Sequence, residues 1–205
     1  MENPASRTYA IAFLGEERGD GRAPTKTPMK TLVLRAGPDD DVRTVAESLR
    51  GAEAERVGDP GLSAGLGGPR DAERSIQLTA LHAEQAVRLG RALNGPGRVT
   101  AFGDLGPYCF VLGRPTEEIR TFCQTILGPL AEDAQRDELR TLEEFLRAHG
   151  SVNGVARALF LHRNTVRQRL KRIGELTGAD LEDAGQRVQL YLAVLGQNAL
   201  AQLAS

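Results

Sequence analysis

A stretch near the C-terminus, residues 151–178, combines the apolar spacing of two short helices with a cluster of basic side chains. The bases are Arg157, Arg163, Arg167, Arg169, Lys171 and Arg172, and no acidic residue occurs from Val152 to Gly174. The whole chain carries 26 basic and 27 acidic residues, for a formal net charge of −1. Positive charge that is concentrated on one element of a nearly neutral chain favours a polyanion bound at that element.

The apolar positions of this stretch predict two helices that are joined by a tight turn. We expect the first helix to bury one face, formed by Val155, Ala156 and Leu159, and to end at a turn formed by Phe160 and Leu161. His162 is then placed to cap the second helix, which we expect to begin near Arg163. In that helix Val166, Leu170 and Ile173 recur at spacings of four and three, so they share its buried face. The pattern is typical of a helix-turn-helix.

The opposite face of the second helix presents amide and cationic groups. Asn164, Gln168 and Lys171 lie opposite the buried face, and Arg167 and Arg172 flank them. An amide can pair with adenine in the major groove, and Arg or Lys with guanine. We therefore expect base contacts from Asn164, Arg167 and Gln168 near the start of the helix. Phosphate contacts, which supply affinity rather than sequence information, are expected from Arg163, Thr165, Arg169 and Lys171.

The competing interpretation is an ordinary solvated helix, because basic helix faces are common. Two features favour double-stranded DNA instead. The two helices are separated by a turn of suitable length, with small Ala156 and Ala158 where they would cross. In addition, Glu175 is the first acid after the bases, so we expect few ion pairs within the helix to neutralise them.

Residues 1–130 show a mixture of strand and helix patterns. Short buried strands are predicted at 9–14 and 30–34, with a loop between them at 15–28. Helices are predicted at 39–51, ending at Gly51, at 71–93, and from Thr116, which would cap the last of them. The Gly-rich segment 56–68 could form a strand with bulges, and residues 98–113 a hairpin that turns near Gly103. This part therefore predicts an α/β sandwich around one sheet.

From Ala131 to the C-terminus only helical patterns occur. Leu139, Leu142, Phe145 and Leu146 form an apolar stripe, and Ser151 can cap the next helix. Asp183 and Gln186 have the spacing of a capping box for a last helix that is apolar nearly all round. Such a helix lies either in a core or partly in a partner subunit. The fold class is therefore α+β, with an α/β domain at 1–130 and an all-α domain at 131–205.

The segment from Leu139 to Val194, above all Leu161-HRNTVRQRLKRI with the following Leu176-TG, resembles the C-terminal DNA-binding domain of PucR/CdaR-type bacterial transcriptional regulators. The helix pair also resembles the Fis-type helix-turn-helix, whose known members are dimeric. The resemblance implies that Arg163, Asn164, Thr165, Arg167 and Arg169 lie at or near DNA. It also implies a homodimer. The apolar last helix and the few DNA contacts that one helix pair can make favour the same expectation.

The upstream residues 56–130 resemble the GGDEF-like domain that precedes this helix-turn-helix in the same family. The similar segments are Gly61-LSAGLGG, the long helix to Leu93 and Val99-TAFGDLGPYCFVL. The signature that binds GTP and metal in diguanylate cyclases does not occur, because Gly67 and Gly68 are followed by Pro69, Arg70 and Asp71. Full-length members usually carry a larger N-terminal sensory domain, so we expect a short member or a piece of a longer protein.

Other functions find less support in the sequence. Cys109 and Cys123 have no metal or redox spacing, and we expect two reduced, packed thiols in the cytoplasm. No apolar run approaches the ~20 residues of a membrane span, and no cofactor, metal or catalytic motif is evident. A small-molecule effector is left open as a further partner, with no residue pattern to identify it. The alternatives to a homodimeric transcription factor are a non-catalytic ligand- or nucleotide-binding module whose helical tail docks to protein, and a residual nucleotide-processing enzyme.

Overall fold

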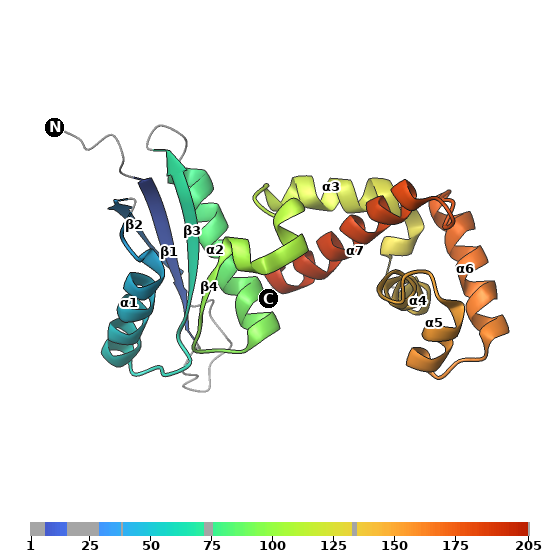
Figure 1. Ribbon diagram of the computed structural model, residues 1–205, viewed down its shortest axis with the longest axis horizontal. Helices are drawn as coiled ribbons and strands as arrows, with labels where there is room; N and C mark the ends of the chain where they lie inside the picture. Colours follow the sequence, from blue (N-terminus) through green and yellow to red (C-terminus); the bar gives the residue numbers. More distant parts are fainter. Residues whose placement is uncertain (1–6, 16–28, 38, 72–75, 133–134, 205) are drawn as a thin grey trace. The chain divides into compact units, whose positions relative to one another are not determined.

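The structure of the protein is a computed structural model that describes residues 7–15, 29–37, 39–71, 76–132 and 135–204 (Figure 1). It divides the chain into two compact units. The first comprises residues 1–113 with residues 202–205, and the second comprises residues 114–201. The predicted loop at 15–28 lies outside the described residues except for Gly15.

The first unit is built on a four-stranded mixed sheet, which confirms the predicted combination of strands and helices. Its strands are β1 (Arg7–Leu14), β2 (Lys30–Ala36), β3 (Ser63–Asp71) and β4 (Val99–Ala101), in the order β2-β1-β3-β4. Strand β1 runs antiparallel to both β2 and β3, and β3 runs parallel to β4. Ile11 in the central strand lies opposite Leu32 on one side and Leu66 on the other.

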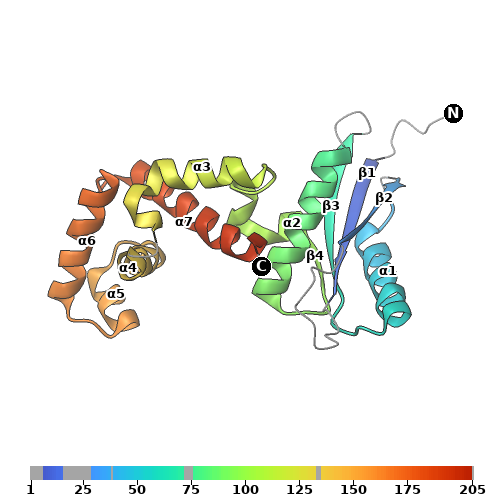
Figure 2. The same cartoon turned by 180° about the vertical axis from the view of Figure 1, so that it is seen from behind.

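Two helices cover opposite faces of this sheet, α1 (Val42–Val57) and α2 (Ile76–Asn94), as Figures 1 and 2 show. Alternate residues of a strand point to opposite faces. Ile11 and Phe13 accordingly pack in the core that includes Ala46 of α1, whereas Ala10 and Ala12 pack in the core that includes Ala83 of α2.

The glycines of β3 are explained by the close approach of α2. A Cβ atom at Gly65 would collide with the backbone carbonyl of Ala83, and one at Gly67 with that of Thr79. The two glycines are two residues apart, so they lie on the same face of the strand. Their missing side chains let the helix backbone rest directly on the sheet.

Two predictions for the first unit are wrong in detail. Helix α1 does not end at Gly51, where an added Cβ would meet open space; it continues to Val57 and ends at Gly58, whose φ of 67° is left-handed. The predicted hairpin at 98–113 has only its first strand, β4. The residues that follow form a 3-10 helix, η1 (Phe102–Phe110), whose start is held by the Ala101 N–H donating to the Asp104 carboxylate at 3.2 Å.

The second unit is helical. Its elements are α3 (Thr116–Leu127), η2 (Gly128–Ala131), α4 (Arg136–Arg147), α5 (Val152–Leu159), α6 (Arg163–Thr177) and α7 (Ala184–Ala204). Helix α3 falls within the α/β domain predicted at 1–130, but the division of the chain lies between Gly113 and Arg114, so α3 belongs to the helical unit. Pro115, not Thr116, is the N-cap residue of α3, and it makes no side-chain capping bond.

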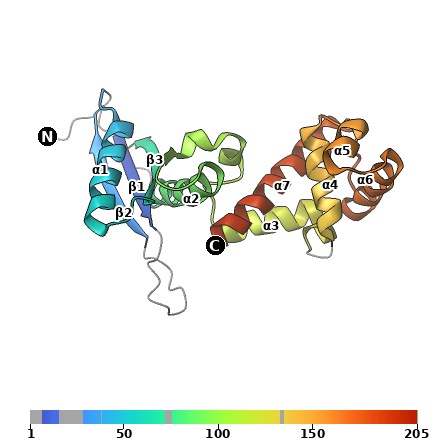
Figure 3. The same cartoon turned by 90° about the horizontal axis from the view of Figure 1, so that it is seen from below.

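A helix that is apolar nearly all round was expected to lie either in a core or partly in a partner subunit. Helix α7 lies in the core of the helical unit. Leu190, Ala193 and Val194 are buried in that core, and α7 runs beside α3 (Figure 3). The Cys123 thiol on α3 donates to the Ala193 carbonyl at 3.4 Å, and burial raises its pKa to about 11. Asp183 caps α7 by accepting from the Gln186 N–H, but the Gln186 side chain accepts from the Asp180 N–H, so the reciprocal half of a capping box is not formed. No helix among the described residues is long and apolar enough to cross a membrane.

Candidate nucleic-acid interface

The helix pair α5–α6 forms as its capping residues predict. The Ser151 hydroxyl accepts from the Gly154 N–H at 3.1 Å at the start of α5. His162 is the N-cap of α6, where its Nδ1 accepts from the Asn164 N–H at 3.2 Å. Between the two helices the chain reverses at Phe160, which has a left-handed φ of 55°, and the Leu161 N–H closes the turn on the Ala156 carbonyl at 2.9 Å.

The orientation of α6 agrees with the predicted faces. Val166 and Ile173 are 0 % exposed and Leu170 is 9 % exposed, so these three side chains fix the helix in the core with Val155 of α5. Asn164, Arg167, Gln168 and Lys171 are all exposed, and Thr165 is half-buried. The amide and cationic groups therefore face solvent along one side of the helix.

The basic side chains of the helix pair differ in their ion pairing. Arg169 is mostly covered and bonds to α4, where its guanidinium donates to the Asp137 carboxylate at 2.6 Å and to the Thr141 hydroxyl at 3.3 Å. This placement departs from the expectation that Arg169 is a phosphate ligand. Arg172 lies 3.5 Å from the Glu138 carboxylate, also on α4.

Lys171 lies 3.8 Å from the carboxylate of Glu175 within α6 itself. The expectation of few ion pairs within the helix agrees with this single pair among the described residues, but Arg169 and Arg172 are paired from α4 instead. The carboxylates that pair Arg169 and Arg172 stand more than thirty positions earlier in the sequence, so helical spacing within α6 could not reveal them.

The remaining cations lie around the turn and the first half of α6. Arg157, Arg163 and Arg167 are exposed, and none of them has an ion-pair partner among the described residues. Uncompensated guanidinium groups are strongly attracted to phosphate. Arg157, Arg163 and Arg167 form the positive face of the helix pair, which is smaller than the sequence suggested. It centres on the N-terminal end of α6, where a recognition helix usually comes closest to the DNA base pairs.

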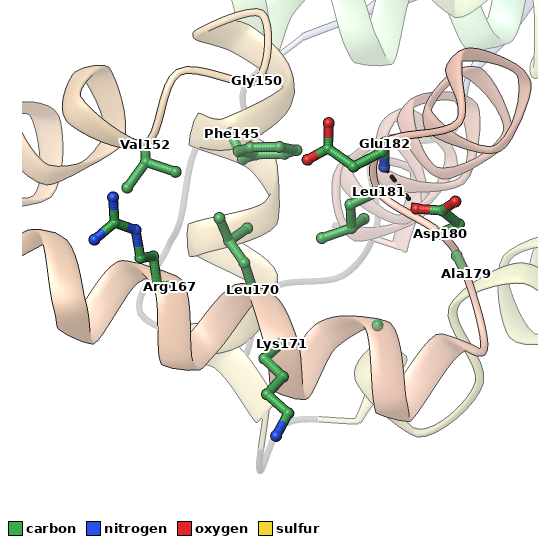
Figure 4. Close-up of a pocket in the computed structure, with 11 residues that line it drawn as sticks. Phe145, Gly150, Val152, Arg167, Leu170, Lys171, Ala179, Asp180, Leu181 and Glu182 are labelled. Carbon is green, nitrogen blue, oxygen red and sulfur yellow. Dashed lines mark hydrogen bonds between the residues drawn. The ribbon is translucent and has the colours of Figure 1, made fainter.

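A cleft of about 400 Å³ lies beside α6 (Figure 4). Its apolar part is formed by Phe145, Val152, Leu170 and Leu181. Arg167 extends from α6 toward Val152, whereas the Lys171 side chain points away from the apolar centre. Asp180 and Glu182 lie on the segment that leads to α7. The Glu182 N–H donates to the Asp180 carboxylate at 2.9 Å, which fixes the acidic side of the cleft. The cleft thus adjoins the positive face and shares Arg167 with it.

In the described part of the chain, no group of three His, Cys, Asp or Glu side chains could hold a metal ion. Cys109 and Cys123 are free thiols, and burial raises the pKa of both. Thiols with raised pKa values are poor nucleophiles at neutral pH, because the thiolate is the reactive form.

One helix, a left-handed turn and a second helix with an exposed polar face define a helix-turn-helix within the helical unit. Residues 139–195 match the PucR C-terminal helix-turn-helix domain. The match covers just over a quarter of the chain.

Among the relatives is the purine catabolism regulatory protein of Bacillus subtilis (strain 168), 36 % identical over 89 residues, which are 42 % of this chain and 17 % of the relative. The carbohydrate diacid regulator of Escherichia coli (strain K12) is 32 % identical over 132 residues, 53 % of this chain and 34 % of the relative. The chain therefore spans about a third or less of the length of these two proteins.

A solved structure, the regulator of polyketide synthase expression from Bifidobacterium adolescentis, is 21 % identical. The similarity covers 94 % of this chain and 85 % of that chain, with a TM-score of 0.38.

Proposed function

We propose that this protein is a sequence-specific regulator of transcription that binds double-stranded DNA through α6. The observation that carries the proposal is the arrangement of that helix. Its apolar side is sealed by Val166, Leu170 and Ile173, and its other side presents amides and unpaired guanidinium groups. The names of the relatives, which are regulators, support the same function.

Within this interface we assign different roles to the side chains. Asn164, Arg167 and Gln168 are proposed to contact base edges, because they are exposed in the first turns of the helix. Arg163 and Thr165 at the start of α6, with Lys171 further along it, are proposed to bind phosphates. Arg169 and Arg172 are proposed to hold α6 against α4, since both lie against carboxylates of that helix.

The sheet unit is proposed to be a non-catalytic relative of GGDEF domains, and the helix pair to be of the Fis type. Gly67 and Gly68 lie within β3, not in a hairpin, so the segment is unlike the cyclase signature. We further propose that the protein is a homodimer, because one helix pair contacts too few phosphates for tight DNA binding. We also propose that it is cytoplasmic. The proposal leaves open whether a small-molecule effector binds, and it includes no enzyme activity.

The test is to select bound sequences from a random duplex pool with the full chain, and then to titrate the selected site with salt. A DNA-binding regulator enriches a defined site, and its affinity falls steeply as salt increases. Absence of duplex binding at ~50 mM salt, where cationic DNA binders are strongest, would favour the alternative of a regulatory module whose helical tail docks to protein. Half-site spacing in the selected sequences, together with sedimentation of the complex, tests the homodimer.

Two variants separate base reading from phosphate binding. Arg167→Ala is expected to cost about 1–3 kcal/mol on the selected site and to relax its sequence preference. Arg163→Ala is expected to weaken binding to selected and random duplexes by similar factors, because phosphates carry no sequence information. Affinities of both variants for both duplexes check this, and equal behaviour of the two would contradict the assignment.

A further inference from the structure

Phe160 combines two features that are unfavourable for the isolated chain. Its side chain is 95 % exposed, the highest exposure among the exposed large apolar residues of the structure's described part. Its backbone also has a φ of 55°, in the left-handed region that glycine adopts most easily. Phe160 is the C-cap residue of α5, and the turn to α6 follows it directly.

Neither feature is required by the turn itself. The hydrogen bonds that close the turn use only the backbone of Phe160 and Leu161, so glycine at this position could make them with less strain. The ring makes almost no contact that would remove it from water, so it adds little hydrophobic stabilisation to the folded chain. A strained residue with an exposed apolar ring indicates a role in binding rather than in folding.

The surroundings of Phe160 indicate which partner is involved. Arg157 lies three residues before it and Arg163 three residues after it, and both are exposed without an ion-pair partner. No acidic residue occurs from Val152 to Gly174. Exposed guanidinium groups on both sides of an apolar side chain match DNA, where phosphates surround sugars and bases.

We infer that Phe160 is a DNA-contact residue, whose ring packs on the apolar surface that a nucleotide exposes beside its phosphates. This inference rests on the proposed function and adds a residue to it. Two parts of a nucleotide offer such a surface, the 5-methyl group of thymine and the deoxyribose ring. Arg157 and Arg163 bind the neighbouring phosphates and hold the ring in place.

The experiment measures duplex affinity and thermal stability of the full chain with three replacements. Phe160→Gly accepts the left-handed backbone and removes the ring; Phe160→Asn also tolerates this backbone and provides a second variant without a ring. Phe160→Tyr keeps the ring. Phe110→Ala is the matched control, because Phe110 is also highly exposed (78 %) but belongs to the sheet unit.

We expect the glycine and asparagine variants to bind the selected duplex about three- to tenfold more weakly, as burial of part of a Phe ring implies. Their melting temperatures should be unchanged or higher. The tyrosine variant and the Phe110→Ala control should bind like the parent protein. Replacing thymine by deoxyuridine in the duplex then distinguishes the two surfaces, because only a contact with the methyl group is lost.

Unchanged affinity in the glycine and asparagine variants would overturn the inference and leave the proposed function intact. A parent protein that binds no duplex would overturn both together. A lower melting temperature for both variants would assign the ring a role in folding and would also overturn the inference.

Discussion

Replacing Arg169 separates a scaffold role from a DNA-binding role on the same helix. Arg169→Met removes the charge and the hydrogen bonds of a side chain that is 24 % exposed, while keeping a long apolar stem. The lost contacts reach Asp137 and Thr141 of α4, so we expect the variant to loosen α6 in the helical unit.

The magnitude follows from these contacts. The Asp137 side chain is 72 % exposed, so its ion pair counts as a surface pair of about 0.2–1 kcal/mol. The hydrogen bond to the buried Thr141 adds about 0.5–1.5 kcal/mol. We therefore expect a loss of roughly 1–2 kcal/mol in the free energy of unfolding of the helical unit. A domain of this size changes its Tm by about 4–8 °C per kcal/mol.

The assay is thermal denaturation of the full chain, followed by circular dichroism, with duplex affinity measured well below the transition. Arg163→Met is the matched control, because Arg163 is exposed and makes no ion pair with a described residue. The control should keep its Tm and lose affinity, whereas Arg169→Met should lose Tm and retain most of its affinity. If Arg169→Met kept its Tm and bound DNA as weakly as the control, Arg169 would be a phosphate ligand and the reasoning would be wrong.

Three further predictions concern the helical unit. Val166→Ala should lower the free energy of unfolding by about 1.5–3 kcal/mol, because the side chain is fully buried and leaves a cavity; denaturant titration checks this, and a loss below 0.5 kcal/mol would mean that α6 is not anchored there. In the same titration, Ser151→Ala should lower the free energy of unfolding by about 0.5–2 kcal/mol, because the N-cap of α5 is lost. Ser151→Asp should retain most of that stability, because its carboxylate can accept the same hydrogen bond. Cys123 should react with iodoacetamide only on unfolding, because its thiol is buried and its pKa of about 11 keeps it protonated at neutral pH; rapid labelling in the native protein would show that α3 and α7 separate easily.

Much of the helical unit could be predicted from the sequence because its signals are local. The spacing of Val166, Leu170 and Ile173 fixes which side of α6 is buried, and that side is buried in the structure. Ser151 and His162 cap the helices that follow them, since a capping side chain needs only backbone N–H groups two or three residues away.

The errors fall where contacts distant in sequence decide. Gly51 reads as a helix stop, but nothing there requires a left-handed backbone, so α1 continues to Gly58. From the sequence, Gly65 and Gly67 indicate only a strand with bulges. The packing of α2 against β3 explains why both positions are glycine. Likewise, the predicted second strand of the hairpin is replaced by η1, whose Asp104 carboxylate pairs with Arg43 of α1, 61 positions earlier.

The same distinction applies to the candidate interface. The sequence by itself determined that six neighbouring bases surround one amphipathic helix pair, because composition and helical period are properties of adjacent residues. Only the tertiary structure decided which of these charges are neutralised. Asp137 and Glu138 pair with Arg169 and Arg172 because α4 packs against α6, and ion pairing depends on distance in space rather than along the chain.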